Sequence, residues 1–311
     1  MYRFIDLFAG IGGFRYALEK KGMECVFSSE IDVKAQEVYQ ANFKETPHGD
    51  IAEISEKKIP AHDILCAGFP CQSFSISGDM KGLDDNRGRL FYEIIRIAQY
   101  HQPHVLLLEN VKNILTVDDG KVIQTIETKL DEIGYKLYKH ILNASYFGIP
   151  QSRERVYFVG LRKDARTKIK LSYKPPKPNY KKIYLEDVLE KKVAEALFIE
   201  RDDMVIDCEN KEHELHPIRI GHVNKGGQGE RIYSDKGHAI TLSAFGGGAG
   251  ARTGLYLAGD RVRRLSINEC KKLMGFPETF FVSEGIQGYQ QLGNAVIPAM
   301  ISHVYDSIRA T

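Results

Sequence analysis

One cysteine stands where a nucleophile is expected. Cys71 follows Pro70 in the stretch GFPCQSFS, shortly after an apolar run that ends at Cys66. In α/β proteins the carboxyl ends of strands form the edge at which ligands bind. A cysteine that only fills space would more commonly lie inside the apolar run, as Cys66 does. The surroundings of Cys71 therefore favour a reactive thiol over a packing residue.

Two further stretches supply an acid and two guanidinium groups. Glu109 closes the apolar run in LLLENV, where desolvation would raise its pKa and let it carry a proton near neutrality. Arg153 and Arg155 alternate with other residues in QSRERV at the start of a predicted strand, so they would share one face. Paired guanidinium groups suit an anionic target. Taken singly, the acid could also cap a helix, and the arginines could form a charged strand edge.

A glycine-rich turn follows the first apolar run. Gly10 and Gly12 fit the start of a dinucleotide fingerprint, but Arg15 occupies the place of its third glycine. Glu30 closes the second apolar run, where an acid can bind ribose hydroxyls, and Asp50 could accept a hydrogen bond from an adenine amine. These residues predict an adenosine-containing ligand, with a turn that serves only packing as the alternative.

Alternating elements must position these groups. Short apolar runs predict strands at 3–7, 25–28, 64–66, 105–108 and 155–161, and helical spacing predicts helices at 14–20, 32–43, 90–100 and 122–133. This alternation favours an α/β sheet that is mostly parallel. Residues 168–182 hold six lysines, three prolines and no acid, which predicts a semi-rigid connector. Beyond it, 225–254 is rich in Gly, Ser and Thr and predicts a loop-rich β region, and 293–308 returns to helical spacing.

Composition narrows the class of protein. With 311 residues, 43% hydrophobic and 27% charged, the chain is an ordinary globular one. We expect no membrane span, since no apolar run approaches the roughly 20 residues needed. The five cysteines lack zinc-type spacing, so we expect a reduced, cytoplasmic protein without a metal. Residues 217–264 hold eight basic and three acidic residues, which suits a polyanion or an unevenly charged surface.

Taken together and in order, these stretches resemble the bacterial DNA cytosine-5 methyltransferases of type II restriction-modification systems. The matching motifs are DLFAGIGGF, GFPCQSFS, ENVKN, QSRERVYFVG, RRLSINECKKLMGFP and QLGNAVIP, spread over nearly the whole chain. The resemblance implies a Rossmann-like sheet with helices on both faces in a catalytic domain of residues 1–180, completed by 286–311. It also implies a smaller, β-rich target recognition domain at 181–285.

The resemblance also implies ligands and roles. The cofactor would be S-adenosylmethionine, leaving S-adenosylhomocysteine, and the substrate a cytosine flipped out of double-stranded DNA. Cys71 would add to C6 of the base, Glu109 would act on it, and Arg155, with Arg153, would assist. The implied cofactor residues are Phe8, Gly10, Gly12, Glu30, Ile31, Asp50, Ile51, Pro70, Leu90 and Asn294. The implied DNA-binding residues are Ser75, Ser77, Gln228, Arg231, Tyr233, Ser243 and Gly247. We expect a monomer associated with the nucleoid through DNA.

The recognition region carries the finer expectations. The stretch NKGGQGERIYSDKGHAITLSAFGGG is similar to that of a family branch that reads GCGC. Asn268 stands where the family usually has Arg, and Ala295 where Ser is common. We expect both departures to affect packing of the recognition domain and not chemistry.

Three other classes of function fit parts of the pattern. A tRNA cytosine-5 methyltransferase could use the same scaffold, but the CFT tripeptide of that branch is absent. A catalytically silent DNA-binding regulator would not need Cys71, Glu109 and Arg155 together. A nicotinamide oxidoreductase fits least, because the third glycine is missing.

Overall fold

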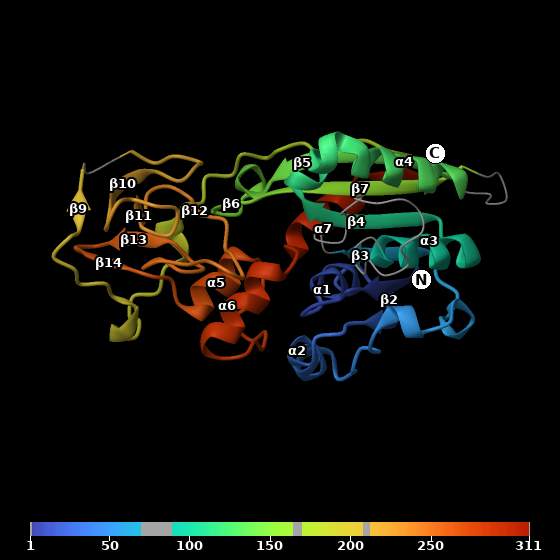
Figure 1. The fold of residues 1–311 in the computed structure, drawn as a ribbon, viewed down its shortest axis with the longest axis horizontal. Coiled ribbons are helices and arrows are strands. Elements are labelled where there is room, and N and C mark those ends of the chain that lie inside the picture. The colour runs from blue at the N-terminus through green and yellow to red at the C-terminus, as the bar shows by residue number, and fades with distance from the viewer. Residues whose placement is uncertain (1, 70–88, 164–169, 208–211, 311) are drawn as a thin grey trace. The chain divides into compact units, whose positions relative to one another are not determined.

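The computed structural model describes residues 2–69, 89–163, 170–207 and 212–310 (Figure 1). The chain forms two compact units. The first unit comprises Met1–Leu142, Arg155–Pro176 and Ile301–Thr311, and the second comprises Asn143–Glu154 and Lys177–Met300. Residues 286–300, which the resemblance placed with the catalytic domain, belong to the second unit in this division.

A six-stranded sheet forms the first unit, in the order β2-β1-β3-β4-β7-β5. Strands β1 to β4 pair in parallel, whereas β7 pairs with β4 in the antiparallel direction. The predicted α/β sheet is confirmed, with β7 reversed relative to the four parallel strands. The strands are β1 (Arg3–Leu7), β2 (Glu24–Ser29), β3 (Ile64–Gly68), β4 (Val105–Val111), β5 (Tyr135–Asn143) and β7 (Glu154–Arg162).

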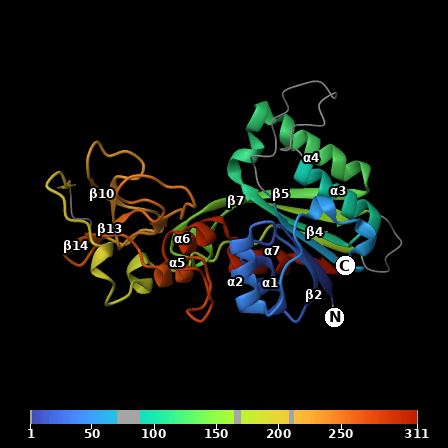
Figure 2. The same cartoon turned by 60° about the horizontal axis from the view of Figure 1, so that its bottom comes forward.

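Helices cover both faces of this sheet. Helices α1 and α2 lie on one face and α3 and α4 on the other (Figure 2). Their bounds are α1 (Gly13–Glu19), α2 (Val33–Phe43), α3 (Arg89–His101) and α4 (Lys121–Glu132), and short 3-10 turns η1 (Ile51–Glu53), η2 (Glu56–Lys58), η4 (Lys112–Leu115) and η5 (Val117–Gly120) join them. Leu65, Leu106 and Phe158 of the strands are fully buried in one core cluster with residues of α3 and α4. The apolar runs read as strands are therefore buried on the sheet.

The helical pattern at 293–308 contains a break. Helix α6 (Gly285–Asn294) ends before Ala295, whose ψ of 152° is extended, and α7 (Pro298–Asp306) begins at a proline. A proline restricts the residue before it to extended backbone and cannot donate an N–H, so one continuous helix cannot form here. Strand β15 (Ile308–Ala310) follows and pairs with β8 (Leu171–Tyr173).

The second unit is β-rich, as predicted for the region after the connector. Its main sheet has the order β14-β13-β11-β10-β9 around a core that includes Ile220, Ile232 and Leu255. The strands are β9 (Val205–Ile206), β10 (Arg219–His222), β11 (Arg231–Ser234), β13 (Leu255–Ala258) and β14 (Arg261–Arg263), and β6 (Gln151–Ser152) pairs separately with β12 (Ala239–Ile240). Helix α5 (Ile267–Leu273), α6 and the 3-10 turns η6 (Ala144–Phe147), η7 (Leu185–Val188) and η8 (Glu195–Leu197) complete it.

A buried ion pair joins β14 to α5 in this unit. The two carboxylate oxygens of Glu269 accept hydrogen bonds from Arg263 at 2.8 and 2.7 Å, and the arginine and glutamate side chains are 3% and 0% exposed. Glu269 also accepts the backbone N–H groups of Ser266 and Glu190 at 2.8 and 2.7 Å. Asn268, the departure from the family pattern, is exposed and donates to Glu190 at 3.3 Å.

We expect Arg263→Met to destabilise the second unit by ~3–5 kcal/mol, because it leaves the Glu269 carboxylate buried without its counter-ion. Urea unfolding of the purified chain measures this loss. Arg261→Met is the matched control on the same strand, since Arg261 pairs with Glu195 at the surface, and its effect should be much smaller. Equal losses for the two variants would contradict the assignment of the buried pair.

Candidate active site and recognition surface

The clearest pair of reactive side chains lies where β4 and β7 meet. Glu109 on β4 is 8% exposed, and its Oε1 lies 3.2 Å from Nε of Arg155 on β7. In the register of the two strands Val111 faces Arg155 and Glu109 faces Tyr157, so the acid and the guanidinium are diagonal neighbours. The structure thus brings together two of the predicted catalytic residues.

The backbone beside this pair leads to the predicted nucleophile. Gly68 at the end of β3 is the register partner of Glu109. Asn110 is 3% exposed, and its Nδ2 donates to the carbonyl oxygen of Phe69 at 2.8 Å. Cys71 itself, like the other predicted residues Pro70, Ser75 and Ser77, lies outside the described residues. Sequence reasoning missed Asn110, although the ENV stretch that contains it was part of the argument.

The three described cysteines are poor candidates for a nucleophile. Burial raises the pKa of Cys25 to about 12 and raises the pKa values of Cys66 and Cys270 well above that of a free thiol. A nucleophilic cysteine requires the thiolate. The thiols at these three positions are therefore inert near neutrality.

Arg153 differs from Arg155 in its surroundings. It lies between β6 and β7, outside either strand, so the alternation along a strand does not place the two arginines on one face. Its guanidinium is buried in the second unit and donates to the carbonyl oxygens of Leu242, Gly293 and Ala295 at 3.2, 3.0 and 2.9 Å. Arg153 is therefore bound to three backbone carbonyl groups, and its catalytic role stays a prediction.

The glycine-rich turn after β1 has unusual backbone angles. Phe8 has a φ of 54°, a strained value for a residue with a side chain, and such strain clusters at functional sites. Gly12, with a φ of 88°, is required by packing, since a Cβ there would lie 2.3 Å from the ring of Phe43. Gly10 has a φ of 55°, and a Cβ there would meet no atom within 4 Å, so its face is open to an approaching ligand.

Glu30 holds this turn against the end of β2. Its Oε2 accepts the N–H of Gly10 at 2.7 Å and its Oε1 accepts the N–H of Asp32 at 2.8 Å. Burial raises the pKa of the Glu30 carboxyl above its ordinary value, although these two N–H donors oppose the shift. Each carboxylate oxygen has a second lone pair with which to accept a ribose hydroxyl.

The other predicted cofactor residues have varied environments. Asp50 caps η1 by accepting the N–H of Ala52 at 2.9 Å, and Ile51 is 2% exposed. Ile31 is 69% exposed beside Glu30, and Leu90 is half-buried on α3. Asn294 is exposed at the end of α6, in the second unit. Within the first unit, Glu30 and the exposed Ile31 directly follow β2, and Asp50 follows His48, which bridges Ser29 of β2. This arrangement fits an adenosine group.

Five of the predicted DNA-binding residues, Gln228, Arg231, Tyr233, Ser243 and Gly247, lie on the second unit. Gln228 and Arg231 are exposed, as are Ser243 and Gly247 on the second glycine-rich stretch. The glycine-rich stretches 226–229 and 246–250 contact each other through their backbones. The N–H of Gly250 donates to the oxygen of Gly229 at 2.8 Å, and a Cβ at Gly229 would lie 1.9 Å from the oxygen of Gly247.

Two aromatic residues lie in the same part of the second unit. The side chain of Tyr233 is 8% exposed and packs near Tyr256, with ring centroids 6.1 Å apart. Phe245, which sequence reasoning missed, is 80% exposed beside Ser243. The single aromatic residue among the small residues of SAFGGG is a sequence signal that could have identified Phe245, because aromatic side chains stack on bases.

The described ranges also bear on membrane spans and metal sites. No helix there combines the length and the apolar character needed to cross a membrane. No group of three or more His, Cys, Asp or Glu side chains within those ranges is arranged to hold a metal ion.

Comparisons with known proteins identify the family of the chain. The family model described as C-5 cytosine-specific DNA methylase matches residues 2–310. The chain is 47% identical over 305 residues to the type II methyltransferase M.HhaI of Haemophilus parahaemolyticus, covering 97% of this chain and 92% of that protein. It is 39% identical over 303 residues to the type II methyltransferase M.DsaV of Dactylococcopsis salina, covering 96% and 83%.

Solved structures show the same fold. The Dnmt2 methyltransferase of S. pombe superposes with a TM-score of 0.76 at 20% identity, covering 98% of this chain and 97% of that one. The methyltransferase EhMeth of Entamoeba histolytica gives a TM-score of 0.76 at 21% identity, covering 99% and 97%. The chain belongs to the family of C-5 cytosine-specific DNA methylases. It is a DNA cytosine-5 methyltransferase whose curated relatives are type II enzymes.

Proposed function

We propose that the chain methylates C5 of a cytosine held outside the DNA helix, with Cys71 as the covalent catalyst. The observation that carries this proposal is the buried contact between Glu109 and Arg155 at 3.2 Å, at the edge where the chain leaves β3 toward Cys71. A carboxyl group held there can interact with N3 of the base while the guanidinium orients both.

The chemistry requires C5 to become a nucleophile. The thiolate of Cys71 forms a bond to C6, which breaks the aromaticity of the ring and moves an electron pair toward C5. Glu109 donates a proton or hydrogen bond to N3 and stabilises the negative charge that develops there, an effect worth about 10²- to 10⁴-fold. When bound, S-adenosylmethionine would supply the electrophilic methyl group that bonds to C5, and S-adenosylhomocysteine would leave. Removal of the C5 proton to a base then expels the Cys71 thiolate and restores the ring.

The cofactor site is proposed on the first unit. Glu30 would accept the ribose hydroxyls, Asp50 the adenine amine, and the exposed side chain of Ile31 would contact the ring. Phe8 and Gly10 would present the strained turn after β1 to the methionine part. The support is the fit of an adenosine group to these residues: a partly buried acid with unused lone pairs, an open glycine and an exposed apolar neighbour.

The DNA site is proposed on the second unit. The exposed side chains of Gln228, Arg231 and Ser243 and the backbone of Gly247 would contact the duplex, with GCGC as the target. The support is the similarity to M.HhaI over 97% of the chain, together with the contact between the two glycine-rich stretches. Flipping the base costs roughly a few kcal/mol of unstacking and unpairing, which DNA contacts must offset. We further propose a role beside a cognate restriction endonuclease in the bacterial cytoplasm, supported by the similarity to type II methyltransferases.

The covalent step can be tested by trapping. A duplex with 5-fluorocytosine at the target should become cross-linked to the chain in the presence of S-adenosylmethionine, because fluorine at C5 cannot leave as a proton does. A denaturing gel detects the adduct. Cys71→Ala should form none while still binding DNA, and Cys25→Ser should cross-link normally because that thiol is inert. An adduct in Cys71→Ala would remove the sulfur from the mechanism.

The affinity for S-adenosylmethionine should depend on the charge of Glu30. Ribose hydroxyls donate to a carboxylate, so affinity is full above the pKa of Glu30 and is lost as pH falls through it. Because burial raises this pKa, the loss should begin at a higher pH than for an ordinary glutamate. Calorimetric titration between about pH 4 and pH 7 measures it. Glu30→Gln should bind weakly with little pH dependence, and exposed Glu24→Gln should follow the unmodified chain.

The target sequence can be read directly. Bisulfite sequencing of a plasmid from cells that express the chain should show 5-methylcytosine confined to GCGC. Gln228→Ala should reduce or relax this pattern, because it removes an exposed side chain at the proposed interface. Complete methylation in another sequence context would refute GCGC and leave the catalytic proposal standing.

A further inference from the structure

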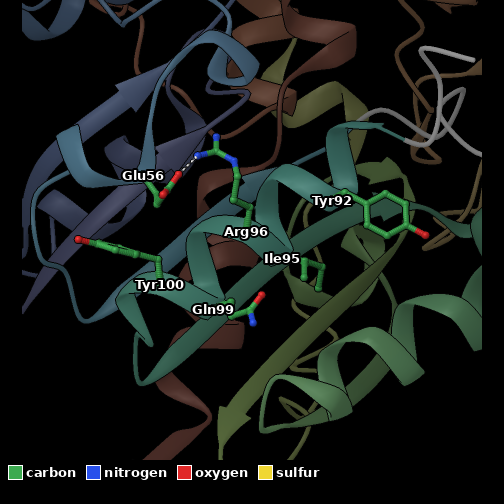
Figure 3. Close-up of a pocket in the computed structure, with 6 residues that line it drawn as sticks. All are labelled: Glu56, Tyr92, Ile95, Arg96, Gln99 and Tyr100. Carbon is green, nitrogen blue, oxygen red and sulfur yellow. Dashed lines mark hydrogen bonds and ion pairs between the residues drawn. The ribbon is translucent and has the colours of Figure 1, made fainter. Parts of the chain in front are cut away.

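One arginine outside the proposed site fastens the segment that carries its adenine end. Arg96 lies in the middle of α3, and its Nη2 donates to the carbonyl oxygens of Ile51 and Ile54 at 3.1 and 3.0 Å. Its Nη1 donates to Glu56 at 2.6 Å (Figure 3). Its Nε donates to Glu93 at 2.7 Å. All three nitrogen atoms of the guanidinium are therefore in use.

These contacts act on one short segment. Residues 51–56 contain η1, in which the N–H of Ala52 donates to the side chain of Asp50, and the start of η2. His101, five residues after Arg96 on α3, adds a contact between its Nε2 and the carbonyl oxygen of Glu56 at 2.8 Å. The segment that begins at Asp50 is thus attached to α3 at several points, although about 40 residues separate the partners in sequence.

The type of residue is specific to this geometry. The planar guanidinium offers several N–H donors in a fixed fork, whereas a lysine ammonium is a compact charge on a flexible stem. Only the fork can reach two carbonyl oxygens of the turn while also pairing with carboxylates on either side. The Arg96 side chain is 30% exposed, so the hydrogen-bond pattern, and not deep burial, accounts for its presence.

We propose that Arg96 is a positioning residue for the cofactor: it holds η1 in the conformation in which Asp50 meets the adenine ring. Arg96 does not itself contact the cofactor. This inference rests on the proposed cofactor site. It predicts that loss of Arg96 weakens S-adenosylmethionine binding and leaves the bond-making residues intact.

The test compares direct binding with turnover. Isothermal titration of Arg96→Met with S-adenosylmethionine should show a Kd raised about tenfold or more, the size expected when a charged donor is lost from a binding element. At saturating cofactor, kcat should stay within about twofold, since the change removes binding common to the ground and transition states. DNA affinity without cofactor should not change. Arg96→Lys should recover only part of the affinity.

Glu93→Gln separates positioning from simple support of α3. It removes an ion pair within that helix but leaves the bonds from Arg96 to Ile51 and Ile54, so its Kd should stay near that of the unmodified chain. Hydrogen exchange at the amides of residues 52–54 should quicken in Arg96→Met and not in Glu93→Gln. If Arg96→Met folds poorly, Arg96→Lys carries the same comparison. An unchanged Kd in a folded Arg96 variant overturns the inference, whereas failure of the unmodified chain to bind overturns the proposed cofactor site instead.

Discussion

The site depends on the direction of one strand. Because β7 runs antiparallel to β4, its first residues lie at the carboxyl edge of the parallel strands, where β3 and β4 end. Arg155 therefore lies near Glu109. A parallel β7 would place Arg155 at the opposite edge of the sheet, a strand length away. Because β7 is reversed, Arg155, which comes later in the sequence, lies beside the carboxyl group of Glu109 on the buried strand β4.

Much of this arrangement could be predicted from residue order. Short apolar runs and turn residues located β1 to β4, and polar residues directly after those runs located Glu30 and Glu109. The direction of β7 and the presence of β5 could not be predicted. Local patterns indicate that a segment is a strand, but pairing depends on contacts distant in sequence. The break in the helix before Pro298 could have been predicted, since a proline restricts the backbone of the preceding residue.

The two arginines of QSRERV show where pattern reasoning fails. Alternation suggested a shared face, but β7 begins at Glu154, so Arg153 precedes the strand. Its guanidinium meets three backbone carbonyls of the second unit, and Arg155 meets a carboxylate of the first. Arg153 and Arg155 thus have different partners, because the backbone changes to strand conformation between them. The role proposed for Arg96 could not be predicted for a related reason, since two of its partners, the carbonyl oxygens of Ile51 and Ile54, are backbone groups that carry no signature in sequence.

The first unit is assembled from three separated parts of the chain, and Ile301–Thr311 is the last of them. This part supplies β15, which pairs with β8, and Asp306, which Lys21 contacts at 2.7 Å. During synthesis on the ribosome the central sheet can form early, but its unit is complete only after the entire second unit has emerged. A nascent chain therefore cannot complete the first unit until Lys177–Met300 of the second unit has been synthesised.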